Sequence, residues 1–293
     1  MAQSSIPSYT TGDLITAAHA NTYWRDNEAA HWTLINRATN PGGRLTLETG
    51  VPVSSADQSA KATLYYTPHV NEFITLYDGA GWNVRTFAEI SLDISGFTAD
   101  KNYDIWAYDN SGTVTLDSTI WTDNFTRATA LAYQDGVLVK SGTETRRYLG
   151  TIRINGTGGQ CEDTITARFV WNMYNQVLRA TGATGLGANT DQTALGKTYY
   201  VIGLAAVVLS MMGGKTTATA ASYCGLYLLT DTASLASADA NAGIWSQTAL
   251  EMHSAGIASK LRVAGYHYVA MGLNVQTTAG VLSEGYISTE LMM

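Results

Sequence analysis

The stretch from Leu64 to Arg153 constrains the fold most, because short alternating runs recur in it between turn residues. Runs such as 73–77 and 103–108 alternate apolar and polar side chains, and Asp, Asn and Gly fill the gaps at 78–81 and 109–112. A period of two, interrupted by turn-forming residues, is typical of antiparallel strands joined by hairpins. The sequence therefore predicts a central β domain.

Three units are expected along the 293 residues. Residues 1–40 form a polar arm and a short helix capped by Thr16, and residues 41–180 form the central β domain. The Gly-, Ala- and Thr-rich segment 180–187 marks a boundary. Beyond it, 181–293 carries five β segments (197–212, 222–230, 244–251, 260–275 and 281–291), of which the longest can hold two strands each. A jelly-roll-like sandwich of about eight strands is the expected fold.

The leader helix, read from 17 to 32, has a narrow and half-polar face built on Ala20, Trp24 and Asn27 with His31 and Leu34. A helix of this kind is marginal in water without a partner. We therefore expect it to dock on a neighbouring copy or on a larger assembly.

Composition favours an assembled β protein over a nucleic-acid binder. Apolar residues make up 45% of the chain and charged residues only 14%, well below the roughly 25% of an average soluble domain. The formal net charge is −7, and no basic cluster is longer than Arg146-Arg147. Nucleic-acid binders usually carry a basic face, so nucleic acid is not expected as a partner.

The cysteines and the hydrophobic pattern bear on compartment. Cys161 and Cys224 are too few for a disulfide framework, and we expect two buried reduced thiols, although a disulfide between them stays open. The N-terminus lacks the charge and apolar core of a signal peptide, and the longest apolar segment, 199–212, is too short for a spanning helix. Synthesis in a cytoplasm without membrane insertion is therefore expected.

Two glycine-rich motifs resemble nucleotide sites only in part. Gly213-Gly214-Lys215-Thr216 ends like a phosphate-binding loop, but Leu209 stands where the pattern needs glycine and no helix pattern follows. We interpret it as a hairpin turn. Gly182, Gly185 and Gly187 have the spacing of a dinucleotide fingerprint in reverse, and we interpret them as linker residues.

Acids and histidines do not form a recognisable catalytic or metal motif. His19, His31, His69, His253 and His267 are not at metal-ligand spacing, so structural or surface roles are expected. Asp104, Asp109 and Asn110 lack the spacing of a calcium loop and are interpreted as turn residues. Glu251, Glu284 and Glu290 are available for glycoside chemistry, but nothing singles out two of them. No catalytic, cofactor-binding or metal-binding residue is assigned.

The chain resembles structural proteins of tailed-bacteriophage virions, of the tail-fibre or minor-structural-protein type. The first segment that carries the resemblance is 12–27, which reads GDLITAAHANTYWRDN. The second runs from 44 to 175 and includes RLTL at 44–47, YYTP at 65–68, LYDG at 76–79, QDGV at 134–137, RRYLG at 146–150 and FVWN at 169–172. The resemblance covers about residues 12–178 and brings no catalytic residues with it.

The resemblance implies a trimeric, β-rich protein located on the virion and attached to other virion proteins through residues 1–40. The expected function is a fibre or spike with 41–180 as its body and 181–293 as an outward head that binds a host glycan or protein. A capsid decoration protein on the head shell is the alternative, and a small polysaccharide depolymerase is the third reading. Tyr and Trp, with 17 and 7 copies, fit strand cores, and a minority fit a binding face.

Overall fold

The computed structural model describes residues 13–14, 16–25, 27–28, 31, 40–187, 192–218, 222–246, 252–275 and 280–293. The leader contains the α-helix α1 (Ala17–Ala20), which continues into a π-helical turn, η1 (Asn21–Arg25). The Thr16 hydroxyl accepts a hydrogen bond from the His19 backbone N–H at 3.3 Å, so the predicted N-cap is confirmed. The predicted arm, 1–12, and the predicted face residue Leu34 lie outside the described residues.

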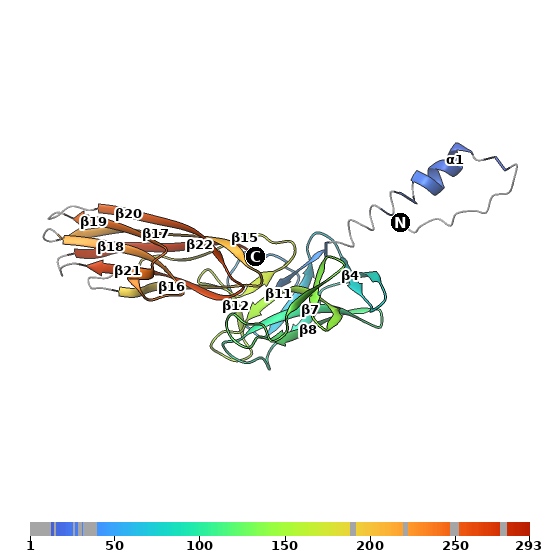
Figure 1. Ribbon diagram of the computed structural model, residues 1–293, viewed down its shortest axis with the longest axis horizontal. Helices are drawn as coiled ribbons and strands as arrows, with labels where there is room; N and C mark the ends of the chain where they lie inside the picture. Colours follow the sequence, from blue (N-terminus) through green and yellow to red (C-terminus); the bar gives the residue numbers. More distant parts are fainter. Residues whose placement is uncertain are drawn as a thin grey trace.

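The expectation of a mainly β protein is confirmed, and Figure 1 shows two β units beside each other with α1 apart from both. The central unit contains β1 (Gly43–Thr46), β2 (Gln58–Lys61), β3 (Thr63–Pro68), β4 (Phe73–Tyr77), β5 (Trp82–Thr86), β6 (Ile90–Asp93), β7 (Asn102–Asn110), β8 (Thr113–Ile120), β9 (Leu131–Gln134), β10 (Val137–Lys140), β11 (Thr143–Arg153), β12 (Cys161–Asp163), β13 (Ala167–Arg168) and β14 (Val170–Asn172). Its sheets follow the orders β1-β3-β6, β4-β5 and β8-β7-β11-β10-β9, with β14 also paired to β11.

The turns between these strands have the predicted chemistry. Ser111 and Gly112 join β7 to β8 with φ values of 54° and 92°, and Asp135 and Gly136 join β9 to β10 with 51° and 83°. Two central residues at positive φ define the hairpin turn whose twist matches that of the flanking strands. In the β4–β5 turn, the Asp78 carboxylate accepts hydrogen bonds from the Ala80 and Gly81 N–H groups, both at 2.8 Å.

The C-terminal unit is a jelly roll. Its strands are β15 (Leu178–Ala183), β16 (Gln192–Ile202), β17 (Ala206–Ala218), β18 (Ser222–Thr230), β19 (Ala240–Ser246), β20 (Met252–Arg262), β21 (Gly265–Val275) and β22 (Gly280–Met292), with a 3-10 turn, η2, at Leu235–Ser237. One sheet has the order β15-β22-β17-β20, and the other contains β19-β18-β21-β16. Each sheet alternates early and late strands, which is the double Greek-key arrangement of a jelly roll.

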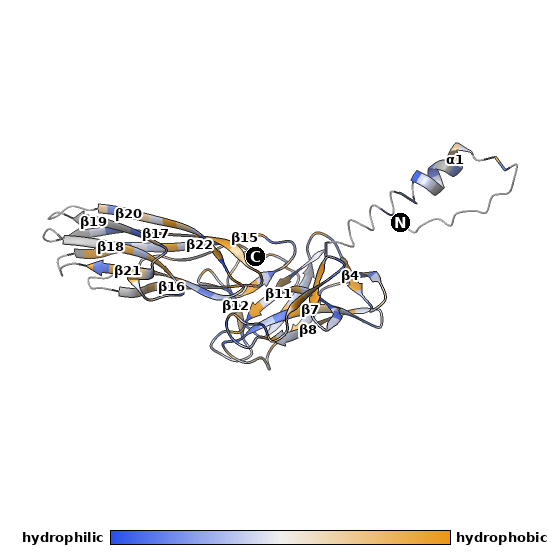
Figure 2. Cartoon of the chain, viewed as in Figure 1, coloured by the Kyte–Doolittle hydropathy of each residue, from blue (hydrophilic) through white to orange (hydrophobic). Residues whose placement is uncertain are grey.

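The two units share one sheet and a continuous core. Strand β16, at the edge of the jelly roll, pairs in parallel with β13, so the sheet continues through β12 to β2 of the central unit. Trp106, Tyr148 and Trp171 of the central unit pack in the same buried cluster as Tyr200 and Ile202 of the jelly roll. Figure 2 shows hydrophobic segments, in orange, on strands of both units. A shared sheet and core make the two units one packed body.

Three segments of the chain after residue 177 differ from what the sequence predicts. Residues 180–183 are not linker: they belong to β15, which pairs with β22, so Gly182 is a strand residue. The predicted boundary at 180/181 therefore falls inside a strand. Most of β20 lies in 252–259, which was not predicted as strand because Ser, Ala and Gly dominate it. Gly213-Gly214-Lys215-Thr216 is not a turn but the interior of β17, paired on both sides.

Candidate functional site

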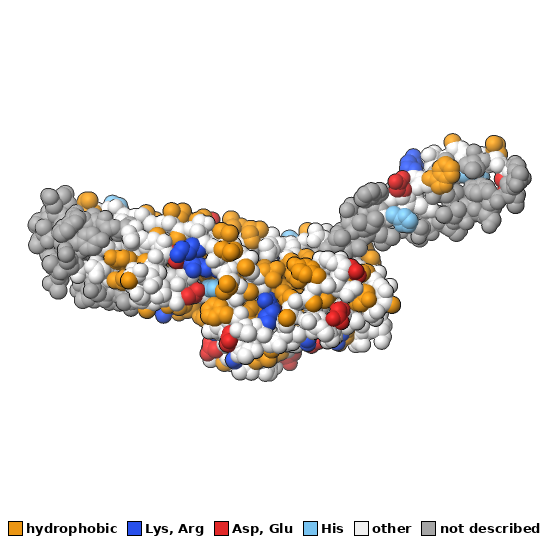
Figure 3. Space-filling model, in the orientation of Figure 1, with side chains coloured by type: hydrophobic (Ala, Val, Ile, Leu, Met, Phe, Trp, Pro, Cys, Tyr) orange, Lys and Arg blue, Asp and Glu red, His pale blue; other side chains and the backbone are white. Residues whose placement is uncertain are grey.

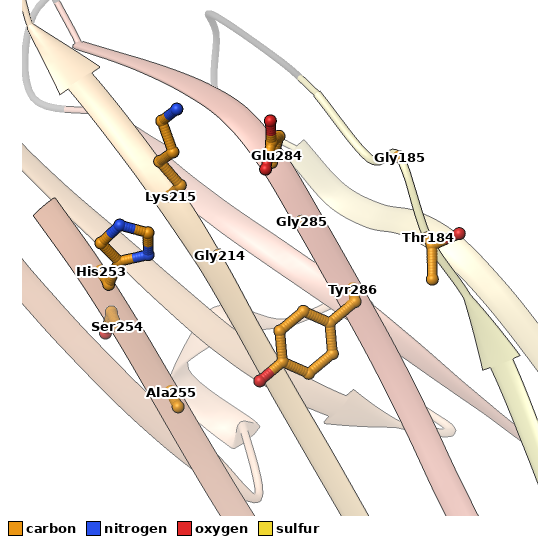
Figure 4. Close-up of a pocket in the computed structure, with 10 residues that line it drawn as sticks. All are labelled: Thr184, Gly185, Gly214, Lys215, His253, Ser254, Ala255, Glu284, Gly285 and Tyr286. Atoms are coloured by element: carbon orange, nitrogen blue, oxygen red, sulfur yellow. The ribbon is translucent and has the colours of Figure 1, made fainter. Parts of the chain in front are cut away.

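A surface hollow lies on the outer face of the four-stranded sheet, in the half of the jelly roll away from the central unit. We call it the Tyr286 groove. It has a volume of about 750 Å³ and is lined by Thr184, Gly185, Gly214, Lys215, His253, Ser254, Ala255, Glu284, Gly285 and Tyr286 (Figure 4). These residues come from β17, β20 and β22 and from the segment that follows β15. A groove of this size is within the range of ligand sites in proteins.

Glycine in β17 determines how the Tyr286 ring lies. Gly213 is the cross-strand partner of Tyr286, and a Cβ at Gly213 would stand 2.4 Å from the Tyr286 hydroxyl oxygen and 2.5 Å from the ring carbon that bears it. The ring therefore rests directly on the glycine backbone, as in other pairs of an aromatic residue with a glycine across a sheet. Tyr286 remains 42% exposed, so the part of the ring that does not contact Gly213 is open to solvent.

Three polar side chains stand in a row across the sheet at one end of the groove. Lys215 pairs in register with Glu284 of β22 on one side and with His253 of β20 on the other. Figure 4 shows all three side chains on the same side of the sheet as Tyr286. The row combines a cation, a carboxylate and an imidazole, so it offers both hydrogen-bond donors and acceptors.

A second feature of the same sheet face is a patch of exposed apolar side chains, which we call the apolar patch. Its members are Leu178, Val207, Ile257, Leu261, Val263 and Met292, which are between 46% and 70% exposed. They lie in the half of the face nearer the central unit, on β15, β17, β20 and β22 and just after β20. Within the described residues of the jelly roll, the strands β16, β18, β19 and β21 carry no large apolar side chain that is similarly exposed. Contiguous exposed apolar side chains of this kind are typical of interaction surfaces.

The most buried charged pair lies at the junction of the two units and not at the surface. Asp104 of β7 is not a turn residue as predicted: its Oδ2 is 2.7 Å from Arg127 Nε, and its Oδ1 accepts a hydrogen bond from the Thr151 hydroxyl at 2.7 Å. Burial raises the pKa of Asp104, and Arg127 and Thr151 oppose that rise. The same guanidinium donates to the Gly203 carbonyl of the jelly roll and to Tyr148. The network joins the two units.

The remaining predicted residues occupy structural or surface positions. His19 and His31 are exposed, whereas His267 is buried, with Nδ1 at 2.6 Å from Asp231 Oδ2 and Nε2 at 2.9 Å from the Val263 carbonyl oxygen. Asp109 is a turn acceptor as predicted, since it receives the Gly112 N–H at 2.6 Å. Glu284 lines the Tyr286 groove, and Glu290 pairs with Leu209 across the sheet. Glu251 lies outside the described residues.

Cys161 is a free thiol with no exposed surface, and burial raises its pKa far above the ordinary value. Such a thiol is unreactive, because the thiolate is the nucleophilic form. Cys224 lies in β18, but its side chain is outside the part of the chain that the structure describes. The state of Cys224 therefore remains a prediction.

No group of three or more His, Cys, Asp or Glu side chains in the described residues is placed to hold a metal ion. Among the helices described, α1 and the short turns, none has the length and hydrophobicity needed to cross a bilayer.

Comparison with known proteins gives only distant matches. No protein-family model and no curated protein matches the chain. Among solved structures, the insecticidal delta-endotoxin Cry8Ea1 from Bacillus thuringiensis matches at 6% identity and a TM-score of 0.26, covering 86% of this chain and 51% of that one. Cry1Da and Cry7Ca1 from the same organism match at 6% and 8% identity, with TM-scores of 0.24 and 0.21. The chain spans about half the length of each, and similarity at this level carries no argument about its function.

Proposed function

We propose that the protein is a structural component of a tailed-phage virion, a homotrimeric fibre or spike that attaches through residues 1–40 and directs its jelly roll outward. The observation that carries the proposal is the apolar patch on one sheet of the jelly roll. The resemblance of residues 12–178 to tail-fibre and minor structural proteins supplies the type of assembly.

The apolar patch supports self-association because of what surrounds it. The chain carries few charges, and Figure 3 shows that apolar and uncharged atoms predominate on the face in view. The two edge strands of the sheet, β15 and β20, both contribute to the patch. Exposed apolar side chains on an edge strand favour association with another chain, which removes them from water. In a trimer, the other two copies of the chain cover the apolar patch, and no other protein is required.

The leader supports attachment to a larger particle. Leu14 and Trp24 are 80% and 62% exposed on the described part of the leader. A helix as short as α1 gains little stability from its own hydrogen bonds, so it needs a surface on which to bury such side chains. In the proposed assembly, that surface belongs to other virion proteins.

The test is the mass of the purified protein by light scattering after size exclusion. A trimer has three times the 31.4 kDa of the chain. The double variant Ile257→Lys, Leu261→Lys is expected to be monomeric, because burying two lysines in the contact is unfavourable. Val70→Lys is the matched control, since Val70 is 60% exposed but lies on the central unit. A monomeric wild type, or a double variant with the wild-type mass, would contradict the proposal.

A capsid decoration protein is the alternative function, since a trimer bound on the head shell would bury the same apolar patch. Labelling purified virions with an antibody against the jelly roll separates the two by position and copy number. Hundreds of sites over the head favour decoration, and a few dozen or fewer at the tail favour the fibre.

A further inference from the structure

We propose that the Tyr286 groove binds an uncharged saccharide, with the Tyr286 ring as the stacking surface for one sugar ring and the Lys215, Glu284 and His253 row as its hydrogen-bonding partners. The site rests on the proposed function only for the origin of the ligand, a glycan on the host surface. Its chemistry is argued from the groove itself.

The aromatic ring supplies the first part of the argument. Tyr286 is held against the backbone of Gly213, so the ring is placed without losing rotamer freedom on binding. The exposed part of the ring lies beside the hollow, whose lining includes Gly214 and Gly285, two residues without a side chain (Figure 4). A fixed and half-exposed aromatic surface attracts the C–H groups on one face of a sugar ring, because these groups carry partial positive charge and the aromatic face is negative.

The polar row supplies the second part. A sugar presents hydroxyls that both donate and accept, and recognition therefore needs both kinds of partner at one place. Glu284 accepts, Lys215 donates and His253 can do either, and the three follow one another in register across β22, β17 and β20. Thr184 adds a hydroxyl to the lining.

The charge balance excludes a strongly anionic ligand. Lys215 is opposed by Glu284 directly across the strand pair, and the lining contains no arginine. Phosphate and sulfate sites depend on clustered cations or on bundled backbone N–H groups. Strand β17, in the groove floor, is paired on both sides, with β22 and β20, so its backbone N–H groups are not bundled toward the groove. An uncharged ligand fits this balance better.

The strands that form the groove floor offer no free edge to an extended peptide. Peptides that recognise sheets usually bind a free strand edge through main-chain hydrogen bonds. Strands β17 and β22, which form the groove floor, are interior strands between β20 and β15. A ligand in the groove therefore contacts side chains on the face of the sheet, which are the Tyr286 ring and the polar row.

The experiment uses the full-length protein on an array of neutral oligosaccharides built from hexoses and N-acetylhexosamines, with sulfated and phosphorylated glycans as a second arm. The strongest neutral binder is then titrated by calorimetry. Binding is expected to the neutral arm, and Tyr286→Ala is expected to weaken it at least about tenfold, the effect of losing one aromatic contact. Tyr286→Phe keeps the ring and is expected to retain most of the affinity.

Tyr133→Ala is the control, because Tyr133 is 73% exposed on the central unit and lies outside the groove. Thermal melts of each variant separate a lost contact from a lost fold. Binding to no neutral glycan, preference for the anionic arm, or unchanged affinity in Tyr286→Ala would overturn the saccharide site. The mass measurement decides the proposed assembly independently, so a monomer that binds glycans, or a trimer that does not, identifies which proposal failed.

Discussion

Replacing Asp104 with asparagine tests whether the junction network holds the two β units together. The side chain of Asp104 is 2% exposed and that of Arg127 14% exposed, so both charges are largely shielded from water. Asparagine keeps the shape and can still accept the Thr151 hydrogen bond, but it leaves the Arg127 guanidinium without a counter-charge. The substitution thus removes the charge and preserves the packing.

The expected loss is near the low end of the range for breaking a buried ion pair. Removal of one partner typically costs about 3–5 kcal/mol, because the other charge remains buried and unpaired. Arg127 retains the Gly203 carbonyl and the Tyr148 hydroxyl as acceptors, and its guanidinium lies 4.3 Å from the centre of the Trp121 ring. These contacts offset part of the cost, so we expect a loss of about 3 kcal/mol in the free energy of unfolding.

The assay is a double-mutant cycle in urea, with Asp104→Asn, Arg127→Met and the double variant at one protein concentration. Unfolding is followed by tryptophan fluorescence, which is sensitive to the junction, and by circular dichroism, which measures the loss of strands. The two signals should change at the same urea concentration if unfolding is two-state. The double variant is expected to lose less stability than the sum of the two single losses. Arg85→Met is the control, since its pair with Asp109 is 31% exposed on the arginine side and is worth at most about 1 kcal/mol. Losses that add to within about 0.5 kcal/mol would refute the coupling.

Four further outcomes are expected. Gly203→Ala places a Cβ 2.1 Å from the Tyr148 hydroxyl oxygen and 2.4 Å from the Trp171 ring, both buried, so thermal unfolding should show a loss of about 1–3 kcal/mol, whereas Gly81→Ala, with open space around it, should change little. Gly213→Ala forces the Tyr286 ring off the sheet and should weaken saccharide binding more than it lowers the melting temperature, and equal binding would refute the placement of the ring. Backbone N–H groups hold the pKa values of Asp78, Asp93 and Asp123 below the ordinary 3.8, so these carboxylates contribute stability above pH 3.8 that is lost as the pH falls toward their folded values. Acid titration of Asp123→Asn should therefore show a shallower loss below pH 3.8 than wild type. Cys161 should not react with a thiol reagent until the protein unfolds, and rapid modification of Cys161 in the native state, identified by peptide mapping, would contradict its burial.

The fold could be predicted where the local signal was strong. The hairpins at 109–112 and 134–137 carry turn residues that tolerate positive φ, and the flanking runs alternate as strands do. The jelly-roll expectation also holds, because five long β segments separated by small-residue loops leave few other closed arrangements. Strand β20 escaped prediction because a strand on a solvent-facing sheet edge can be built from Ser, Ala and Gly without an apolar repeat.

The candidate site was much harder to predict. Gly213-Gly214 reads as a turn in sequence, since glycine usually marks one, but here it permits an aromatic ring to lie on a strand. Glu284 and Lys215 are 69 positions apart and meet only because β17 pairs with β22. No spacing rule in the sequence relates them.

The sequence by itself determined the class of the fold, because periodicity and turn residues are local properties of the chain. The tertiary structure alone decided that β13 joins the jelly-roll sheet and that Asp104 is a buried ion-pair partner. It also decided that Tyr286, Lys215, Glu284 and His253 share one face. These are contacts between residues far apart in sequence, and their positions depend on how whole strands pair and pack.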